Sequence, residues 1–225
     1  MLTNIGLAKH VKRALNEQWG YVLGTFGGYL TESLLRYKIE QYGNKVSKYY
    51  DFIKEHYIGR RTADCVGLAK SYIWWNDELD NPVYNSKTDI NETQMFNLAT
   101  EKGTIDTMPE IEGICVWKQG HMGVYIGGGQ IIEAKGTKHG VVQTPLKGSG
   151  SSNFTHWFKC PFIEYIERDD NMADIPQWKK DCADYLVKQG YLNVPHDPLE
   201  NVDIGTLGAI LKNRDEKIKE ILKQI

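Results

Sequence analysis

Hydrophobic and polar positions follow two different periods along the chain. In the first hundred residues, apolar side chains recur every three to four positions, as on one face of a helix. This pattern predicts helices over 4–19, in two segments between 30 and 58, from 63 to 75 and from 91 to 102. From Gly113 onward the pattern alternates and predicts strands near 114–117, 121–126, 130–134, 140–143 and 156–160. Helices followed by consecutive strands are typical of an α+β domain with an antiparallel sheet.

Glycines and capping residues set the helix limits. The first helix is expected to end at Gly20, and the segment 30–58 breaks at Gly43-Asn44, as an inserted helical hairpin would. Asp64 stands at the start of the helix over 63–75 as an N-cap. Cys65 is therefore expected in the first turn of that helix.

A charged stretch interrupts the pattern after the last predicted strand. The sequence Glu-Arg-Asp-Asp-Asn at 167–171 predicts a linker over 166–172. Residues 1–165 would then form one domain, and residues 173–225 a small helical C-terminal region. The latter resembles wall-binding tails of the S-layer-homology type only in outline, so a packing or dimerisation role is an equal alternative.

Composition excludes several classes of protein. The chain has 225 residues, with 27 basic and 29 acidic side chains and a net charge of −2, which argues against a nucleic-acid partner. No apolar run approaches the ~18 residues of a membrane span, and charges occupy the region where a signal peptide needs its apolar segment. We expect no membrane association, and synthesis in the cytoplasm without a signal peptide.

The four cysteines, Cys65, Cys115, Cys160 and Cys182, show neither the spacing of a disulfide framework nor a C-x-x-C pair. We therefore expect no structural metal and no cofactor. A helix N-terminus lowers the pKa of a thiol because its free N–H groups favour negative charge. Cys65 is thus a candidate nucleophile, with a buried structural cysteine as the alternative; for Cys115 and Cys160 the structural reading is preferred.

A catalytic thiol needs an imidazole as base and a third polar group to orient that imidazole. His121 and Glu133 lie on two consecutive predicted strands joined around Gly127–Gly129. A turn with an odd number of residues places both side chains on one face of the hairpin, whereas a two-residue turn separates them. Otherwise His121 is an ordinary strand histidine and Glu133 an exposed carboxylate.

These three pieces, in this order, resemble the NlpC/P60 cysteine peptidases, papain-like enzymes that cut the peptide stems of bacterial peptidoglycan. Their nucleophile motif, Asp-Cys-x-Gly, is matched by Asp64-Cys65-Val66-Gly67, and their Gly-His-x-Gly strand by the segment from Gly120 to Gly127. The third residue of the family, most often His, falls on Glu133. The resemblance implies a papain-like NlpC/P60 fold with Cys65, His121 and Glu133 as the catalytic triad.

An upstream motif of the family, whose tyrosine lies beside the nucleophile, resembles Tyr21-Val-Leu-Gly24-Thr25. Its longer distance from Cys65 is explained by the helical insertion at about 30–58. The resemblance covers roughly residues 8–165. The sequence around the motifs is similar to that of phage and prophage endolysins of clostridia.

Further residues near the motifs are candidates for substrate binding. The resemblance places Tyr21 beside the nucleophile, and Asp64 directly precedes it in the sequence. Arg60 and Arg61 come just before this motif, where they could pair with substrate carboxylates such as that of isoglutamate. The alternative for the two arginines is a solvated basic corner. Trp117, four residues before His121, is a candidate for the substrate groove, although most tryptophans simply pack.

The resemblance implies a cysteine endopeptidase that degrades peptidoglycan, without metal or cofactor. One alternative is an N-acetylmuramoyl-L-alanine amidase with the same triad. Another is a non-catalytic module that binds the wall or belongs to a phage particle. The expected absence of a signal peptide favours an endolysin, an antimicrobial phage-lysis enzyme that acts on the wall after release. The sequence predicts neither the scissile bond nor the oligomeric state.

Overall fold

The structure is a computed structural model, and it describes residues 1–166 together with Lys212, Arg214, Glu216 and Lys219. Met1–Ile166 forms one compact unit. The predicted linker after residue 166 and the predicted helices of the C-terminal region lie outside the described residues, apart from the four just named. The linker and the C-terminal helices therefore stay predictions.

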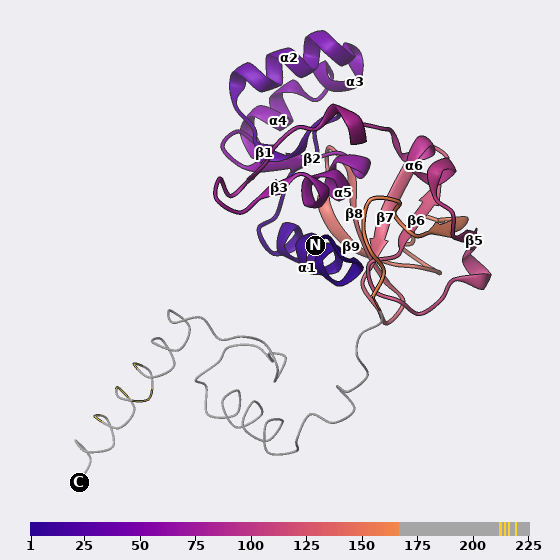
Figure 1. Cartoon of the computed structure of the whole chain (residues 1–225). Coiled ribbons are helices and arrows are strands. Elements are labelled where there is room, and N and C mark those ends of the chain that lie inside the picture. The colour runs from indigo at the N-terminus through magenta and orange to yellow at the C-terminus, as the bar shows by residue number, and fades with distance from the viewer. Residues whose placement is uncertain (167–211, 213, 215, 217–218, 220–225) are drawn as a thin grey trace. The chain divides into compact units, whose positions relative to one another are not determined.

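A six-stranded antiparallel sheet is the centre of this unit (Figure 1), with the strand order β5-β10-β6-β7-β8-β9. The strands are β5 (Lys102–Thr104), β6 (Cys115–Lys118), β7 (His121–Tyr125), β8 (Gln130–Gly136), β9 (Gly140–Pro145) and β10 (His156–Phe158). The predicted α+β class and five of the six strands are confirmed.

The edge strand β5 corrects the sequence prediction. Helix α6 spans Glu92–Leu98 and does not reach residue 102, because Ala99 takes an extended conformation. The ammonium group of Lys102 donates to the carbonyl oxygens of Phe96 and Asn97, both at 2.9 Å. These carbonyl groups of the last turn of α6 thereby obtain hydrogen-bond donors from a residue beyond the helix. Lys102 thereby ends the helix instead of continuing it.

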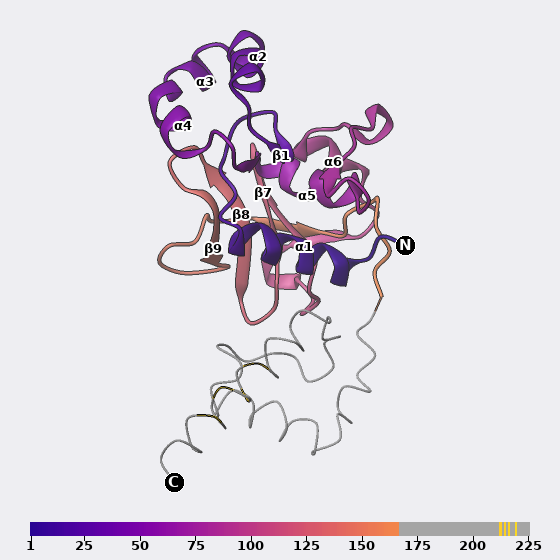
Figure 2. The same cartoon turned by 90° about the vertical axis from the view of Figure 1, so that its left-hand side faces the viewer.

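Two helices cover one face of the sheet. Helix α1 (Asn4–Asn16) lies across the strands in Figure 2, and α5 (Cys65–Ile73) packs beside it. The main core gathers buried apolar side chains of both helices and of the sheet: Leu7, Val11, Ala14, Leu68, Ala69, Met122, Val124, Ile132 and Ala134. Helix α1 ends at Asn16 and not at Gly20, because Gln18 already has a left-handed backbone with a φ of 54°.

The segment between β1 (Phe26–Tyr29) and β2 (Arg61–Ala63) forms a helical group at one end of the sheet (Figure 1). It contains three helices, α2 (Glu32–Tyr42), α3 (Asn44–Ser47) and α4 (Tyr50–His56), where the sequence predicted two. The predicted break at Gly43 is present, and a second break falls at Lys48 and Tyr49. These helices share a core of their own, which contains Val22, Leu30, Leu35, Val46, Ile53 and Tyr57.

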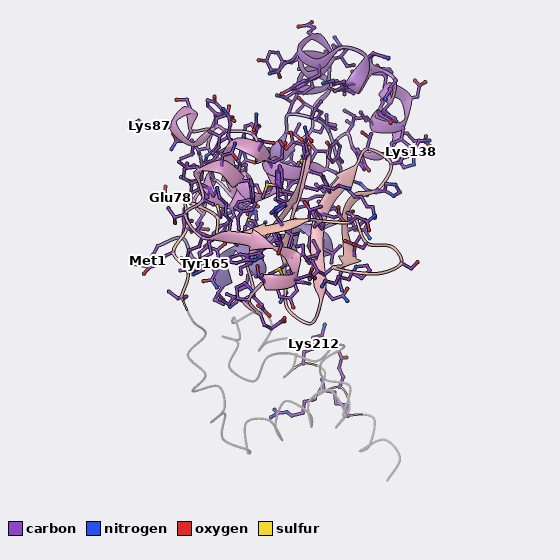
Figure 3. All side chains as sticks on the ribbon, turned by 90° about the vertical axis from the view of Figure 1, so that its right-hand side faces the viewer. Met1, Glu78, Lys87, Lys138, Tyr165 and Lys212 are labelled. Atoms are coloured by element: carbon purple, nitrogen blue, oxygen red, sulfur yellow. The ribbon has the colours of Figure 1, made fainter. Side chains whose placement is uncertain are left out.

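The helical group is fastened to the sheet at the turn between β8 and β9. The hydroxyl of Tyr57 donates to the carbonyl oxygen of Thr137 at 2.6 Å. The neighbouring Lys138 marks this turn in Figure 3. The contact fixes the group beside the sheet, so that α2 can form a wall of the cavity described below.

The remaining elements are short: β3 (Trp75–Asn76), β4 (Asn81–Pro82) and the 3-10 helices η1 (Ser86–Thr88) and η2 (Ile105–Thr107). On the second face of the sheet lies a smaller core of Ile114, Val116, Tyr125, Ile131 and Phe154. None of the helices that the structure describes is long and apolar enough to cross a membrane.

Candidate active site

Cys65 is the first residue of α5, where the sequence placed it. The Asp64 carboxylate caps the helix by accepting from the backbone N–H of Gly67 at 2.6 Å, and it also accepts from the backbone N–H of Gly24 in the preceding loop at 2.8 Å. A side chain at position 67 would meet the carbonyl oxygen of Thr25 at 2.0 Å. Glycine is therefore required there, because the Tyr21–Thr25 loop packs directly on the first turn of the helix.

The thiol of Cys65 faces two backbone N–H groups, that of Val66 on its own helix and that of Met122 on β7. Met122 directly follows His121, so the thiol lies beside the start of the strand that carries the imidazole. Helix α5 packs against both β7 and β8. The packing thus brings Cys65 to the part of the sheet where His121 and Glu133 meet.

Opposing effects act on the pKa of Cys65. Burial and the nearby Asp64 carboxylate raise the pKa of the thiol to about 12, although the N–H groups of Met122 and Val66 lower it. Desolvation therefore outweighs the lowering by the helix N-terminus. A thiolate here needs a base that takes the proton.

His121 and Glu133 lie side by side, as an odd-numbered turn predicts. Ile126 pairs with Gln130 at the end of the β7–β8 hairpin, which leaves a three-residue turn over Gly127–Gly129. His121 Nε2 is 2.5 Å from Glu133 Oε2. Because an ionised carboxylate only accepts hydrogen bonds, Nε2 donates the proton.

Gly123 makes room for this pair. A Cβ at position 123 would come within 2.7 Å of Ile131, 3.2 Å of the Glu133 Cβ and 3.2 Å of the Phe154 ring. The ring of Phe154 stacks on the His121 imidazole with centroids 5.6 Å apart and planes 13° from parallel. The imidazole is thus held between a carboxylate and an aromatic ring.

Two hydroxyl groups that the sequence analysis did not identify hold the Glu133 carboxylate. Thr144 Oγ1 donates to Oε1 at 2.5 Å, and Ser152 Oγ lies 2.7 Å from Oε1 and 2.8 Å from Oε2. Glu133 is completely buried. Burial raises its pKa, but hydrogen bonds from His121, Thr144 and Ser152 together bring the pKa below the usual value. The carboxylate is therefore ionised beside the imidazole.

Cys65 opens into a cavity of about 830 Å³. Its walls come from the Tyr21–Phe26 loop, from helix α2, from the first turns of α5 and from the segment 84–92. The lining includes Tyr21, Phe26, Lys38, Tyr42, Cys65, Lys70, Tyr84, Asp89 and Glu92. A substrate in this cavity would touch the inserted helices as well as the nucleophile motif.

The predicted substrate-binding residues divide into two groups. Tyr21 lines the cavity together with Cys65, and burial, with the charges of Cys65 and Asp64, raises the pKa of its hydroxyl. Asp64 also borders the cavity, but its carboxylate is occupied by the two backbone N–H groups. Tyr21 is thus free to contact a substrate, whereas Asp64 shapes the loop and the helix.

Arg61 does not face the cavity. Its side chain is 3% exposed, and its guanidinium donates to the carbonyl of Gly27 at 2.9 Å, to Asn81 Oδ1 at 3.2 Å and to the Asp80 carboxylate at 2.9 Å. It also stacks over the rings of Tyr29 and Trp75. Its predicted pairing with a substrate carboxylate is therefore replaced by a structural role. Arg60 is exposed and does not line the cavity.

Trp117 also lies outside the cavity. Its ring stacks on Phe96 with centroids 4.3 Å apart and planes 5° from parallel. Its buried Nε1 has no hydrogen-bond partner among the described residues. The structure thus favours packing over the predicted groove. Cys115 and Cys160 are buried in the main core, as the structural interpretation required.

Within the described part of the chain, no group of three or more His, Cys, Asp or Glu side chains could hold a metal ion. Of the three predicted catalytic residues, Cys65 lines the cavity, whereas His121 and Glu133 are not among its lining residues. The site thus combines a buried thiol with a hydrogen-bonded imidazole and an ionised carboxylate on the adjoining hairpin. This set suits proton transfer and nucleophilic attack by sulfur.

Comparison with known proteins gives little at the sequence level: no family model matches the chain, and no curated protein matches it. Two solved structures are similar over 72% of the chain. One is the P60 domain of an antigen from Mycobacterium avium subspecies paratuberculosis, with 16% identity, 98% of that chain covered and a TM-score of 0.36. The other is the peptidoglycan hydrolase RipB from Mycobacterium tuberculosis, with 18% identity, 67% covered and a TM-score of 0.35. Because both TM-scores are below 0.5, the chemistry is assigned from the residues of this chain.

Proposed function

We propose that the chain is a thiol hydrolase of the NlpC/P60 type that cuts an amide bond in the peptide stem of bacterial peptidoglycan. The observation that carries the proposal is the short contact between His121 and Glu133 on the hairpin whose first strand also faces the Cys65 thiol. The match of Asp64-Cys65-Val66-Gly67 and of Gly120-His121 to the motifs of that family supports the choice of substrate.

The hydrogen bond to Glu133 fixes the tautomer of the imidazole. With Nε2 protonated and donating, Nδ1 carries the lone pair that can accept the proton of the thiol. The Cys65 sulfur then attacks the carbonyl carbon of the amide, and the C–N bond breaks as the imidazolium returns the proton to the leaving amine. Water hydrolyses the thioester by the same proton transfers in reverse, which releases the acid and restores the thiol.

The carbonyl oxygen becomes negatively charged when sulfur adds to the carbon. The backbone N–H of Cys65, at the N-terminus of α5, is one donor that can stabilise this charge. An ionised Glu133 stabilises the imidazolium at the same moment. Both effects favour the tetrahedral intermediate over the resting state, in which burial keeps the thiol neutral.

The direct test is hydrolysis of purified peptidoglycan by the wild type and by Cys65→Ala. We expect release of soluble fragments with the wild type only. Mass spectrometry of the fragments distinguishes an endopeptidase, which leaves a new amino terminus within the stem, from an amidase, which frees the amino group of L-alanine. Binding to the wall without hydrolysis by the wild type would instead support a non-catalytic module.

We also propose that this activity serves phage lysis. In that case the protein should accumulate harmlessly inside expressing bacteria and lyse them only when the membrane is permeabilised. Lysis without permeabilisation, abolished in Cys65→Ala, would contradict the endolysin role and leave the hydrolase intact.

A further inference from the structure

Two lysine side chains are buried in the wall of the cavity next to Cys65. One forms an ion pair with a carboxylate, and the other does not. Lys70, on α5, is 7% exposed, and its Nζ lies 2.5 Å from Asp89 Oδ1. Lys38, on α2, is also 7% exposed, but its Nζ donates to the neutral amide oxygen of Gln41 at 3.0 Å. Among the described residues, no carboxylate forms an ion pair with Lys38.

A buried ammonium group is costly unless an opposite charge or several hydrogen bonds compensate for lost hydration. Lys70 has this compensation in Asp89. Lys38 has one neutral acceptor and two aromatic rings, those of Tyr37 and Tyr42, whose centroids lie 5.1 and 5.8 Å from Nζ. Burial lowers the pKa of Lys38, and the more distant Asp64 and Asp89 only partly oppose that effect.

The two carboxylates that act on Lys38 already have hydrogen-bond partners of their own. Asp64 accepts from two backbone N–H groups, and Asp89 accepts from Lys70 and, at 3.0 Å, from the hydroxyl of Tyr84. An anion that enters the cavity therefore finds an ammonium group in Lys38 whose donors are only partly used. Helix α2 holds that group on the wall facing the nucleophile loop.

We propose that Lys38 is a specificity-determining residue that binds a carboxylate of the peptide substrate. This inference rests on the proposed function, because it concerns the same cavity. Stem peptides offer two such groups, the α-carboxylate of isoglutamate and the side-chain carboxylate of diaminopimelate, and both occur in nature as the carboxamide. The substrate carboxylate would then pair with Lys38 as Asp89 pairs with Lys70.

The test compares soluble stem peptides that differ only in one carboxylate. One pair carries the acid or the amide at isoglutamate, and a second pair at diaminopimelate. We expect the KM of the wild type to be roughly 10-fold lower for the acid in one of the two pairs, as one charge-assisted hydrogen bond implies. Lys38→Met should remove that preference by raising the KM of the acid form, with kcat little changed, and Lys38→Arg should keep most of it.

Lys48→Met is the matched control, because Lys48 is an exposed lysine of the same helical group that does not line the cavity. It changes the net charge equally and should leave the preference intact. The proposal is wrong if the wild type shows no preference in either pair, or if the preference survives in Lys38→Met. Lys38→Gln replaces Lys38→Met if circular dichroism shows that the latter does not fold.

Failure of the proposed function gives a different result. If the wild type hydrolyses none of the four peptides, calorimetric titration of the full-length protein with each peptide decides the role of Lys38 alone. Tighter binding of one acid form, lost in Lys38→Met and kept in Lys48→Met, supports the carboxylate site. Equal binding of acid and amide, or no binding of any peptide, overturns it.

Discussion

His121 Nε2 donates a hydrogen bond to Glu133 Oε2 at 2.5 Å, and the accepting carboxylate is completely buried. A buried carboxylate at this distance stabilises a positive charge on the imidazole more effectively than a neutral group would. Glu133 is therefore suited to hold His121 in the orientation and tautomer that accept the proton of Cys65.

Glu133→Gln tests this relationship, because it keeps the shape and a hydrogen-bond acceptor but removes the charge. We expect a fall in the hydrolysis rate of roughly 10–100-fold, as for other groups that orient a reacting residue. The alkaline limb of the pH–rate profile should move to lower pH, because the charge that favours the imidazolium is missing. An unchanged rate and profile would mean that another polar group orients His121.

The hydroxyl of Ser152 is predicted to stabilise the folded protein through the charge of Glu133. Ser152→Ala removes the hydroxyl donor that lies within hydrogen-bond distance of both carboxylate oxygens and should lower the free energy of unfolding by about 1–3 kcal/mol at pH 7. The folded-state pKa of Glu133 is lowered, so its stabilisation is present above its unfolded pKa and is lost as pH falls through the folded value. The deficit of Ser152→Ala should therefore shrink in acid.

Ser151→Ala is the control for this measurement. The Ser151 hydroxyl donates to the carbonyl oxygen of Leu146 at 2.8 Å and does not contact Glu133. Its effect on urea unfolding should be independent of pH from 7 down to below the folded-state pKa of Glu133. A pH-independent deficit in Ser152→Ala as well would show that the charge of Glu133 does not depend on Ser152.

The parts of the site that depend on local sequence could be predicted, because neighbouring residues determine them. Asp64 caps the helix that Cys65 begins, and the glycine turn fixes the register that places His121 and Glu133 on one face. In each case a capping residue or a turn length decides the geometry. The alternating strands were predicted for the same reason.

The missed residues depend on contacts between distant segments. Ser152 follows a glycine- and serine-rich stretch that resembles an ordinary loop, yet it reaches Glu133 across 19 positions. A lysine at position 38 of a predicted helix is expected to be exposed. It is buried only because α2 folds over the cavity. Arg61 precedes the nucleophile motif, but its partners are Gly27 on β1 and Asp80 between β3 and β4, which no local pattern brings together.

Arg61 is predicted to support stability and not substrate binding. Arg61→Met leaves the buried Gly27 carbonyl without its guanidinium donor and leaves Asp80 with Arg13 alone, so it should lower the free energy of unfolding by about 2–4 kcal/mol. The exposed neighbour Arg60 serves as control, and Arg60→Met should stay within ~0.5 kcal/mol. The KM of the folded Arg61→Met protein should equal that of the wild type; a large rise in KM would restore Arg61 as a substrate ligand.

The proposed mechanism makes the reactivity of Cys65 depend on His121, because burial and Asp64 raise the pKa of the thiol to about 12. A thiol with that pKa is ionised to only about one part in ten thousand at pH 8. The proposed mechanism has the imidazole accept the proton, so iodoacetamide should alkylate Cys65 of the wild type at neutral pH, ahead of the buried Cys115 and Cys160.

In His121→Ala this acceptor is gone. The alkylation rate at Cys65 should fall sharply at pH 7 and then rise by about tenfold per pH unit through pH 10 without a plateau, as expected for direct ionisation of a weakly acidic thiol. His139→Ala, which removes an exposed imidazole at the β8–β9 turn, should behave as the wild type. Peptide mapping assigns the modified cysteine. If Cys65 of His121→Ala reacts at the wild-type rate at pH 7, the proton goes to another group and His121 is not the base.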